Sequence, residues 1–203
     1  MARIDSIEAL TAKYPPVTER AVLKEMTALE KHSRRFIELS PFLVIGTTGK
    51  DGRGDNSPRG ETPGFVQVLS DKLIAIPDRP GNNRLDTFKN IIANPNVGLL
   101  FMIPGVPEIL RINGRAELRD DADLMQRFVV NGRPPRLVVL VNVDEAYLHC
   151  AKAIMRSGLW DAAAQHPRTV LPTMGEMIRD QIGRDIAVES QAELDARHRS
   201  QFY

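Results

Sequence analysis

The chain has 203 residues, of which 42% are hydrophobic and 26% are charged, and its formal net charge is +1. These are the proportions of an ordinary globular protein, and the near-zero charge disfavours a dedicated DNA- or RNA-binding protein, because a long polyanion needs a strong positive field. A single cysteine excludes an intrachain disulfide framework and a cysteine-only zinc site.

The first 40 residues predict an arm and a helix. The start, MARIDSIEAL, has no apolar signal-peptide core, and residues 1–17 end in a Tyr-Pro-Pro sequence that predicts a rigid end to the arm. Thr18 fits the N-cap of a helix that Ser40-Pro41 would end. The apolar face of this helix comprises Val22, Met26, Leu29 and Phe36.

From residue 42 the apolar pattern changes to that of β-strands. Short apolar and β-branched runs between turn residues predict strands at 42–48, 53–58, 64–69, 72–76, 97–103, 109–118 and 136–143. Helices are expected at about 84–93 and 122–130. The hairpin spacing, without regular alternation of strand and helix, predicts an antiparallel barrel or sandwich.

The last 50 residues are polar, helix-like and increasingly charged. They predict a tail that packs on the barrel or on a partner subunit. We therefore expect an N-terminal arm (1–17), a barrel domain that includes its N-terminal helix (18–165), and a C-terminal helical tail (166–203). No apolar run approaches the roughly 20 residues needed to cross a bilayer, so we expect a cytoplasmic protein without a membrane partner.

Two polar clusters follow predicted strands. Residues 56–60 (Asn-Ser-Pro-Arg-Gly) combine a hydroxyl, the guanidinium of Arg59 and a glycine that permits close backbone approach. Residues 77–84 lead into a helix, where free N–H groups, the helix dipole and Arg84 would favour an anion. The alternative to an anion site is that residues 77–84 only form a turn and cap the helix, and that Arg59 is a solvated surface side chain. Two arginine-bearing loops on neighbouring elements favour a ligand.

A third cluster, residues 149–160, contains the only tryptophan and the only cysteine. If the segment is helical, His149, Lys152 and Arg156 share one face, with Trp160 a turn further on; Trp160 could equally anchor the core or an interface. The four histidines are scattered without metal-ligand spacing, which disfavours a metal site. A thiol enzyme and an NTPase are disfavoured on similar grounds.

Taken in order, these motifs resemble the pyridoxamine 5′-phosphate oxidase-like superfamily of FMN-binding split barrels, and within it a group of predicted flavin-nucleotide-binding proteins. The motifs are Ser-Pro-Arg-Gly at 57–60, Ile-Pro-Asp-Arg-Pro-Gly-Asn-Asn-Arg at 76–84, Asn-Pro at 94–95, Gly-Leu-Leu-Phe at 98–101, Leu-Arg-Ile-Asn-Gly-Arg-Ala at 110–116, and residues 149–160. The resemblance spans about 35–165. It implies a mainly β fold with flanking helices, an antiparallel six- to seven-stranded split β-barrel, and a homodimer with FMN at its interface.

The resemblance also implies the cofactor-binding residues. The arginine and glycine at 59–60 match contacts to the flavin and its phosphate, and residues 77–78 match backbone contacts near the ring edge. The pair at 83–84 matches a basic phosphate-binding pair, but reads Asn-Arg for Arg-Lys, so Arg59 or Arg79 would share the phosphate. The segment after residue 150 would reach the partner subunit's flavin. The full set is Ser57, Arg59, Gly60, Pro77, Asp78, Asn82, Asn83, Arg84, Lys152, Arg156, Ser157 and Trp160.

The function implied is an FMN-dependent oxidoreductase acting on a small molecule, with NAD(P)H as a candidate reductant. True pyridoxamine-phosphate oxidases carry an Arg-Leu-His-type motif, whereas residues 156–160 here read Arg-Ser-Gly-Leu-Trp, so vitamin B6 oxidation is disfavoured and no catalytic residue is assigned. Two alternatives stay open. One is a flavin carrier or redox sensor without turnover; the other is a haem or deazaflavin in the same cleft, with His149 as the haem ligand.

Overall fold

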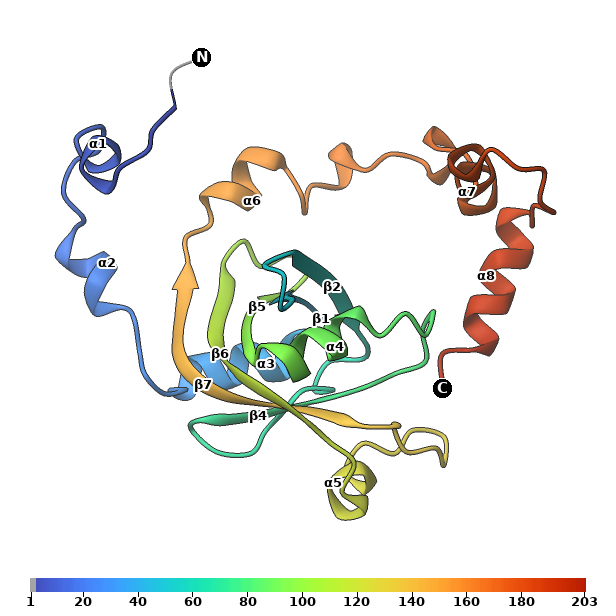
Figure 1. Cartoon of the computed structure of the whole chain (residues 1–203), viewed down its shortest axis with the longest axis horizontal. Coiled ribbons are helices and arrows are strands. Elements are labelled where there is room, and N and C mark those ends of the chain that lie inside the picture. Colours follow the sequence, from blue (N-terminus) through green and yellow to red (C-terminus); the bar gives the residue numbers. More distant parts are fainter. Residues whose placement is uncertain (1–2) are drawn as a thin grey trace.

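The computed structural model describes residues 3–203, and its centre is a seven-stranded antiparallel sheet that curls into a barrel (Figure 1). The strand order is β2-β1-β5-β6-β7-β4-β3. This confirms the predicted mainly β fold, an antiparallel split barrel with flanking helices. The strands are β1 (Phe42–Thr48), β2 (Gly54–Gly60), β3 (Gln67–Val68), β4 (Leu73–Pro77), β5 (Asn96–Met102), β6 (Ile109–Arg119) and β7 (Val138–His149).

Helices flank the barrel or lie beyond it (Figure 1). Over residues 3–203 they are α1 (Ile7–Thr11), α2 (Glu19–Leu23), α3 (Lys31–Leu39), α4 (Asp86–Ala93), α5 (Ala122–Gln126), α6 (Lys152–Ser157), α7 (Met174–Ile182) and α8 (Gln191–Ser200), with short 3₁₀ turns at Ala162–Ala164 and Arg168–Val170. In the same range no helix is both long and apolar enough to cross a membrane.

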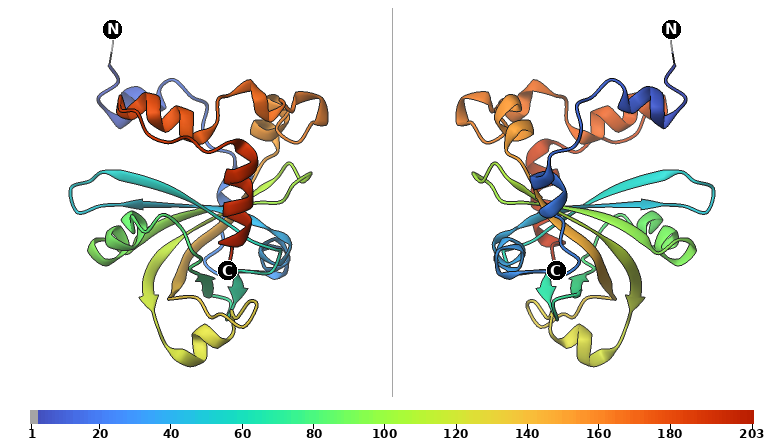
Figure 2. Two further views of the ribbon diagram at one scale, coloured as in Figure 1. Left: turned by 90° about the vertical axis from the view of Figure 1, so that its right-hand side faces the viewer. Right: turned by 90° about the vertical axis from the view of Figure 1, so that its left-hand side faces the viewer.

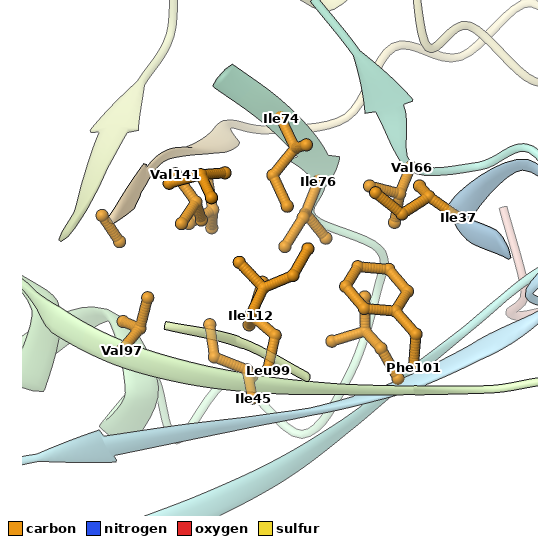
Figure 3. Close-up of a cluster of buried hydrophobic side chains, with 14 of the residues drawn as sticks. Ile37, Ile45, Val66, Ile74, Ile76, Val97, Leu99, Phe101, Ile112 and Val141 are labelled. Carbon is orange, nitrogen blue, oxygen red and sulfur yellow. The ribbon is translucent and has the colours of Figure 1, made fainter. Parts of the chain in front are cut away.

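The core lies inside the curl of the sheet, where facing strands meet (Figure 3). Side chains alternate along a strand, so every second residue of β1 and β5 points inward: Leu43 and Ile45 are buried, as are Leu99 and Phe101. The helix α3 adds Ile37 to this core. The outer faces of the same strands stay exposed or half-buried, which leaves this side of the barrel without a covering layer.

The single helix predicted from Thr18 to Ser40 is wrong, because the chain forms two helices with a break between them. In the break, Met26 and Ala146 exchange backbone N–H···O bonds of 3.0 and 2.7 Å, and the Leu29 N–H donates to the Asp71 carbonyl at 2.7 Å. These contacts fix the segment against β7 and bury Leu29 in the core. Tertiary hydrogen bonds therefore replace the helical ones that local spacing predicted.

The predicted strand at 64–69 is also mostly wrong. Only Gln67 and Val68 pair with β4, although Phe65 and Val66 are buried in the core. Gly64 has a φ of 88°, a left-handed backbone that breaks an extended strand. The apolar pattern thus identified core residues correctly but not their conformation.

Both ends of the chain extend from the barrel as arms on the same side of the sheet (Figures 1 and 2). The N-terminal arm carries α1 and α2, and the C-terminal arm carries α6 to α8. Much of their apolar surface is exposed: Ile7 is 75% exposed, Leu23 69% and Met155 71%. Large exposed apolar surfaces are typical of interaction sites.

Candidate functional site

A cavity of about 960 Å³ opens beside the edge strand β2, in the size range of small-molecule sites. Its walls are residues 55–59 of β2, residues 78–89 and Ile92 from the end of β4 into α4, Leu118 of β6, residues 133–137 before β7, and Ser200, Gln201 and Tyr203 at the end of α8 and just beyond it. The structure therefore places the two arginine-bearing loops around one cavity, although their strands, β2 and β4, are not neighbours in the sheet.

The β2 wall presents Ser57 and Arg59 on one face of an alternating strand. The Arg59 Nη1 donates to the Ser57 hydroxyl at 2.7 Å and to the Pro58 carbonyl at 3.1 Å, and the guanidinium lies 5.7 Å from the centre of the Phe88 ring. Because β2 is an edge strand, it tolerates Pro58, which cannot donate to a neighbouring strand. These contacts hold a half-buried cation at the cavity wall.

The second wall is a loop that turns sharply into α4. The Asn82 carboxamide oxygen accepts the Arg84 N–H at 3.1 Å, and Asn83 and Leu85 have left-handed φ values of 58° and 63°. Asparagine tolerates this region, whereas for leucine it is a strained conformation of the kind that clusters at functional sites. The helix begins at Asp86, so Arg84 lies before the first turn rather than in it.

The Arg84 side chain is 75% exposed and its Nε pairs with the Asp86 carboxylate at 2.8 Å. The first N–H groups of α4 have no acceptor within the helix. The loop therefore contributes backbone donors and an exposed cation to the cavity, next to the more buried Arg59.

Arg79 has a different place from the one the sequence suggested. Its Nε and Nη2 donate to the Glu61 carboxylate at 2.6 and 3.2 Å, and its Nη1 donates to the Phe128 carbonyl at 3.0 Å. The Glu61 side chain is only 6% exposed. Arg79 is thus a fixed part of the wall, with its donors largely used, rather than a free partner for a phosphate.

The cavity is electrostatically suited to an anion. Among the described lining residues there are six cationic and three acidic side chains, although the whole chain carries only +1. Within residues 3–203, Arg59 and Arg136 form no ion pair. Burial lowers the pKa of Arg59, and the carboxylates of Asp78 and Asp55 only partly oppose this. An anion placed here would compensate the desolvated guanidinium.

Burial disfavours the charged form of Asp78 too, and for a carboxylate this raises the pKa. The Arg59 and Arg136 guanidinium groups oppose the shift. The Asp78 N–H donates to the Leu137 carbonyl at 3.0 Å. Pro77 has no N–H and the Asp78 N–H is already bonded, so the backbone of these two residues can offer a ligand only carbonyl oxygens.

The predicted site residues fall into two sets. Those that line the cavity are Ser57, Arg59, Asp78, Asn82, Asn83 and Arg84. Pro77 and Gly60 end their strands outside the lining. A Cβ on Gly60 would lie 3.3 Å from the Phe42 ring, so tight packing between strands accounts for this glycine.

The third cluster lies elsewhere on the chain. Lys152, Arg156 and Ser157 belong to α6, whose Ser157 hydroxyl donates to the Ile154 carbonyl. Trp160 follows α6, and its Nε1 donates to the Val106 carbonyl at 2.9 Å. None of these four lines the cavity of the same chain.

His149 does not share a helical face with Lys152, because β7 continues to His149, six residues beyond the predicted end of the strand. Its ring lies 5.3 Å from the Tyr147 ring, outside the cavity lining. Burial lowers the pKa of His149, with smaller contributions from Lys24 and Arg111.

Sequence reasoning missed many of the cavity residues, among them Arg133, Arg136 and Tyr203. Arg133 and Arg136 flank a Pro-Pro pair just before β7, and this third arginine-bearing turn was visible as a turn signal beside a strand. Tyr203 gave no local signal, since its position depends on the path of the C-terminal arm.

A family model described as "Pyridoxamine 5′-phosphate oxidase" matches residues 29–150, more than half of the chain. No curated protein matches the sequence. HupZ from Group A Streptococcus is a similar solved structure, with 14% identity over 59% of this chain and 93% of that one and a TM-score of 0.49. The general stress protein 26 from Bacillus anthracis has 16% identity over 58% of this chain and 93% of that one, with a TM-score of 0.44. An FMN-binding protein from Syntrophomonas wolfei has 8% identity over 58% of this chain and 83% of that one, with a TM-score of 0.46.

Proposed function

The chain belongs to the pyridoxamine 5′-phosphate oxidase family, and on that premise we propose that it is a flavoprotein that binds FMN in the 960 Å³ cavity. The observation that carries the proposal is the half-buried Arg59, without an ion pair among the described residues, facing a loop of backbone donors. A phosphate monoester carries about −1.5 to −2 charges, which this excess of cations suits.

In this proposal each wall has its own task. Arg59, with the N–H groups at the start of α4, holds the phosphate; Arg84 adds an exposed charge that must leave Asp86 to reach the ligand. Asp78, which lines the cavity where β4 ends, would offer its carbonyl oxygen to the ring edge. When bound, the flavin would supply the electron or hydride transfer, while the protein sets its orientation and access.

We further propose a homodimer that covers the outer face of β1 and β5. Cross-strand neighbours put Val44 beside Leu100 and Phe42 beside Met102 on this face, and Leu100 is 37% exposed. The two arms, which lie on the same side of the sheet (Figure 2), would pack against the second copy. In such a dimer Lys152, Arg156, Ser157 and Trp160 would approach the partner's cavity. Burial of these apolar surfaces would drive the association.

The reaction proposed is oxidation or reduction of a small molecule. A flavin carrier without turnover is the second candidate, favoured by the lack of an Arg-Leu-His-type motif at residues 156–160. The two differ in rapid mixing with NADH or NADPH: bleaching of the bound flavin supports the enzyme, and a flavin that no donor reduces supports the carrier. The visible absorption spectrum separates FMN from a deazaflavin and from a haem.

The test of the binding site compares FMN with riboflavin, which lacks the phosphate. Arg59→Gln should weaken FMN by about ten- to a hundredfold, the effect of a charge-assisted hydrogen bond of about 1.5–3 kcal/mol, and leave riboflavin binding unchanged. Arg53→Gln, in the exposed turn before β2, is the matched control and should bind FMN like the wild type. A colourless protein that binds no FMN would refute the proposal.

A further inference from the structure

The end of the C-terminal arm lines the cavity, far in sequence from its other walls. The helix α8 begins at a capping box in which the Ser190 hydroxyl accepts the Glu193 N–H and the Glu193 carboxylate accepts the Ser190 N–H. Leu194 is buried, and Arg197 pairs with Glu189 at 2.7 Å. The helix is thus an ordered element that delivers Ser200, Gln201 and Tyr203 to the cavity.

Tyr203 is held there by two arginines. The Arg79 guanidinium lies over its ring, 5.5 Å from the ring centre, and Arg133 Nη1 donates to its main-chain oxygen. Arg79 is itself held by Glu61 and the Phe128 carbonyl, so its guanidinium keeps its position against the Tyr203 ring. The ring position is therefore set by the barrel and not by the arm alone.

The ring forms a wall and does not fill the cavity. The volume of about 960 Å³ is the space that remains with Tyr203 in place. Among the described lining residues the other aromatic ring is Phe88, which is 7% exposed and lies under the Arg59 guanidinium. Tyr203 is only half-buried, so of the two rings it is the more accessible to a ligand in the cavity.

We propose that Tyr203 is a ligand-contacting residue of this cavity, and that the planar aromatic ring of the bound ligand stacks on it. The inference rests on the proposed flavin-binding function and deepens it by assigning the ring end of the ligand to the C-terminal arm. Offset stacking of aromatic rings is favourable at centroid distances of about 4.5–7 Å, and a rigid, preplaced ring loses little entropy on binding.

The experiment measures the dissociation constants of FMN and riboflavin for the full-length wild type, Tyr203→Leu and Tyr203→Phe. Leucine keeps apolar bulk without an aromatic face and should weaken both ligands by the same factor, about tenfold, the usual scale of stacking on an aromatic side chain. Phenylalanine should bind both like the wild type. Phe202→Leu is the matched control, because Phe202 is 56% exposed and lies outside the cavity lining; it should change neither constant.

The outcomes separate this inference from the proposed function. Equal weakening of both ligands in Tyr203→Leu, against FMN-only weakening in Arg59→Gln, would support the stacking role. Wild-type affinity in Tyr203→Leu, or the same loss in Phe202→Leu, would overturn it and leave flavin binding intact. A wild type that binds neither ligand would refute both.

Discussion

Arg59 shows how contacts of a single residue place a cation at the wall of this cavity. Local contacts to Ser57 and Pro58 and the ring of Phe88 fix its direction, while burial lowers its pKa. Arg79, only twenty residues away, is instead tied to Glu61 inside the wall. Two arginines that looked equivalent in sequence therefore have different roles: Arg59 is available to a ligand, and Arg79 stabilises the cavity wall through Glu61.

The Glu61–Arg79 pair should dominate the stability of the wall. Glu61→Ala leaves a guanidinium with 17% exposure without its carboxylate, and we expect a loss of about 3–5 kcal/mol in the free energy of unfolding. Urea denaturation followed by circular dichroism measures it. The control Asp121→Ala removes an exposed partner of Arg119 and should cost far less; equal costs would contradict a structural role for the buried pair.

Asp78 gives a pH dependence with a definite sign. Because its pKa is raised in the folded protein, the ionised form is disfavoured there, so Asp78 contributes most stability below its unfolded value of 3.8 and loses it as the pH rises through the folded value. Asp78→Asn removes this loss. The variant should gain stability relative to the wild type on going from pH 3 to pH 7, measured as melting temperature at each pH. A difference that is constant across this range would contradict the prediction.

At the scale of elements, the long pair β6–β7 shapes the barrel. The register shifts between Asn113 and Gly114, a β-bulge that increases local twist. A Cβ on Gly114 would lie 2.1 Å from the Asn142 carbonyl oxygen and 3.2 Å from the Val141 side chain. The glycine is therefore required by the close approach of the two strands.

Gly114→Ala should destabilise the protein by about 1–3 kcal/mol or more, the cost of overpacking against a backbone atom that cannot move aside. Thermal unfolding of the variant measures this. Gly54→Ala in β2 is the control, because a Cβ there meets no atom within 4 Å, and it should unfold within about 0.5 kcal/mol of the wild type. An unaffected Gly114→Ala would mean that the bulge can relax.

At the scale of the whole molecule, the uncovered outer face of the sheet and the arms beside it suggest an assembly. The proposed dimer places Leu100 in its interface. The division into an arm (1–17), a barrel (18–165) and a tail (166–203) stays a prediction.

Leu100→Asp should shift the protein from dimer to monomer in light scattering after size exclusion. An unpaired carboxylate in an apolar interface costs about 3 kcal/mol, roughly a hundredfold in the dissociation constant. Val129→Asp is the matched control, since Val129 is 38% exposed and Leu100 is 37% exposed, but Val129 lies beyond α5. A wild type that is monomeric at all concentrations would contradict the dimer.

The ordered sequence motifs pointed to the family, which the family model confirms. Apolar and β-branched runs between turn residues are local signals, and they predicted an antiparallel barrel or sandwich, of which the structure is the barrel. The sequence also identified Arg59 and the loop before α4. The tertiary structure was needed to show that Met26 pairs with Ala146 of β7, that Arg79 binds Glu61, and that Tyr203 reaches the cavity. Each of these depends on partners distant in sequence, whose hydrogen bonds and charges outweigh local preference once the chain is folded.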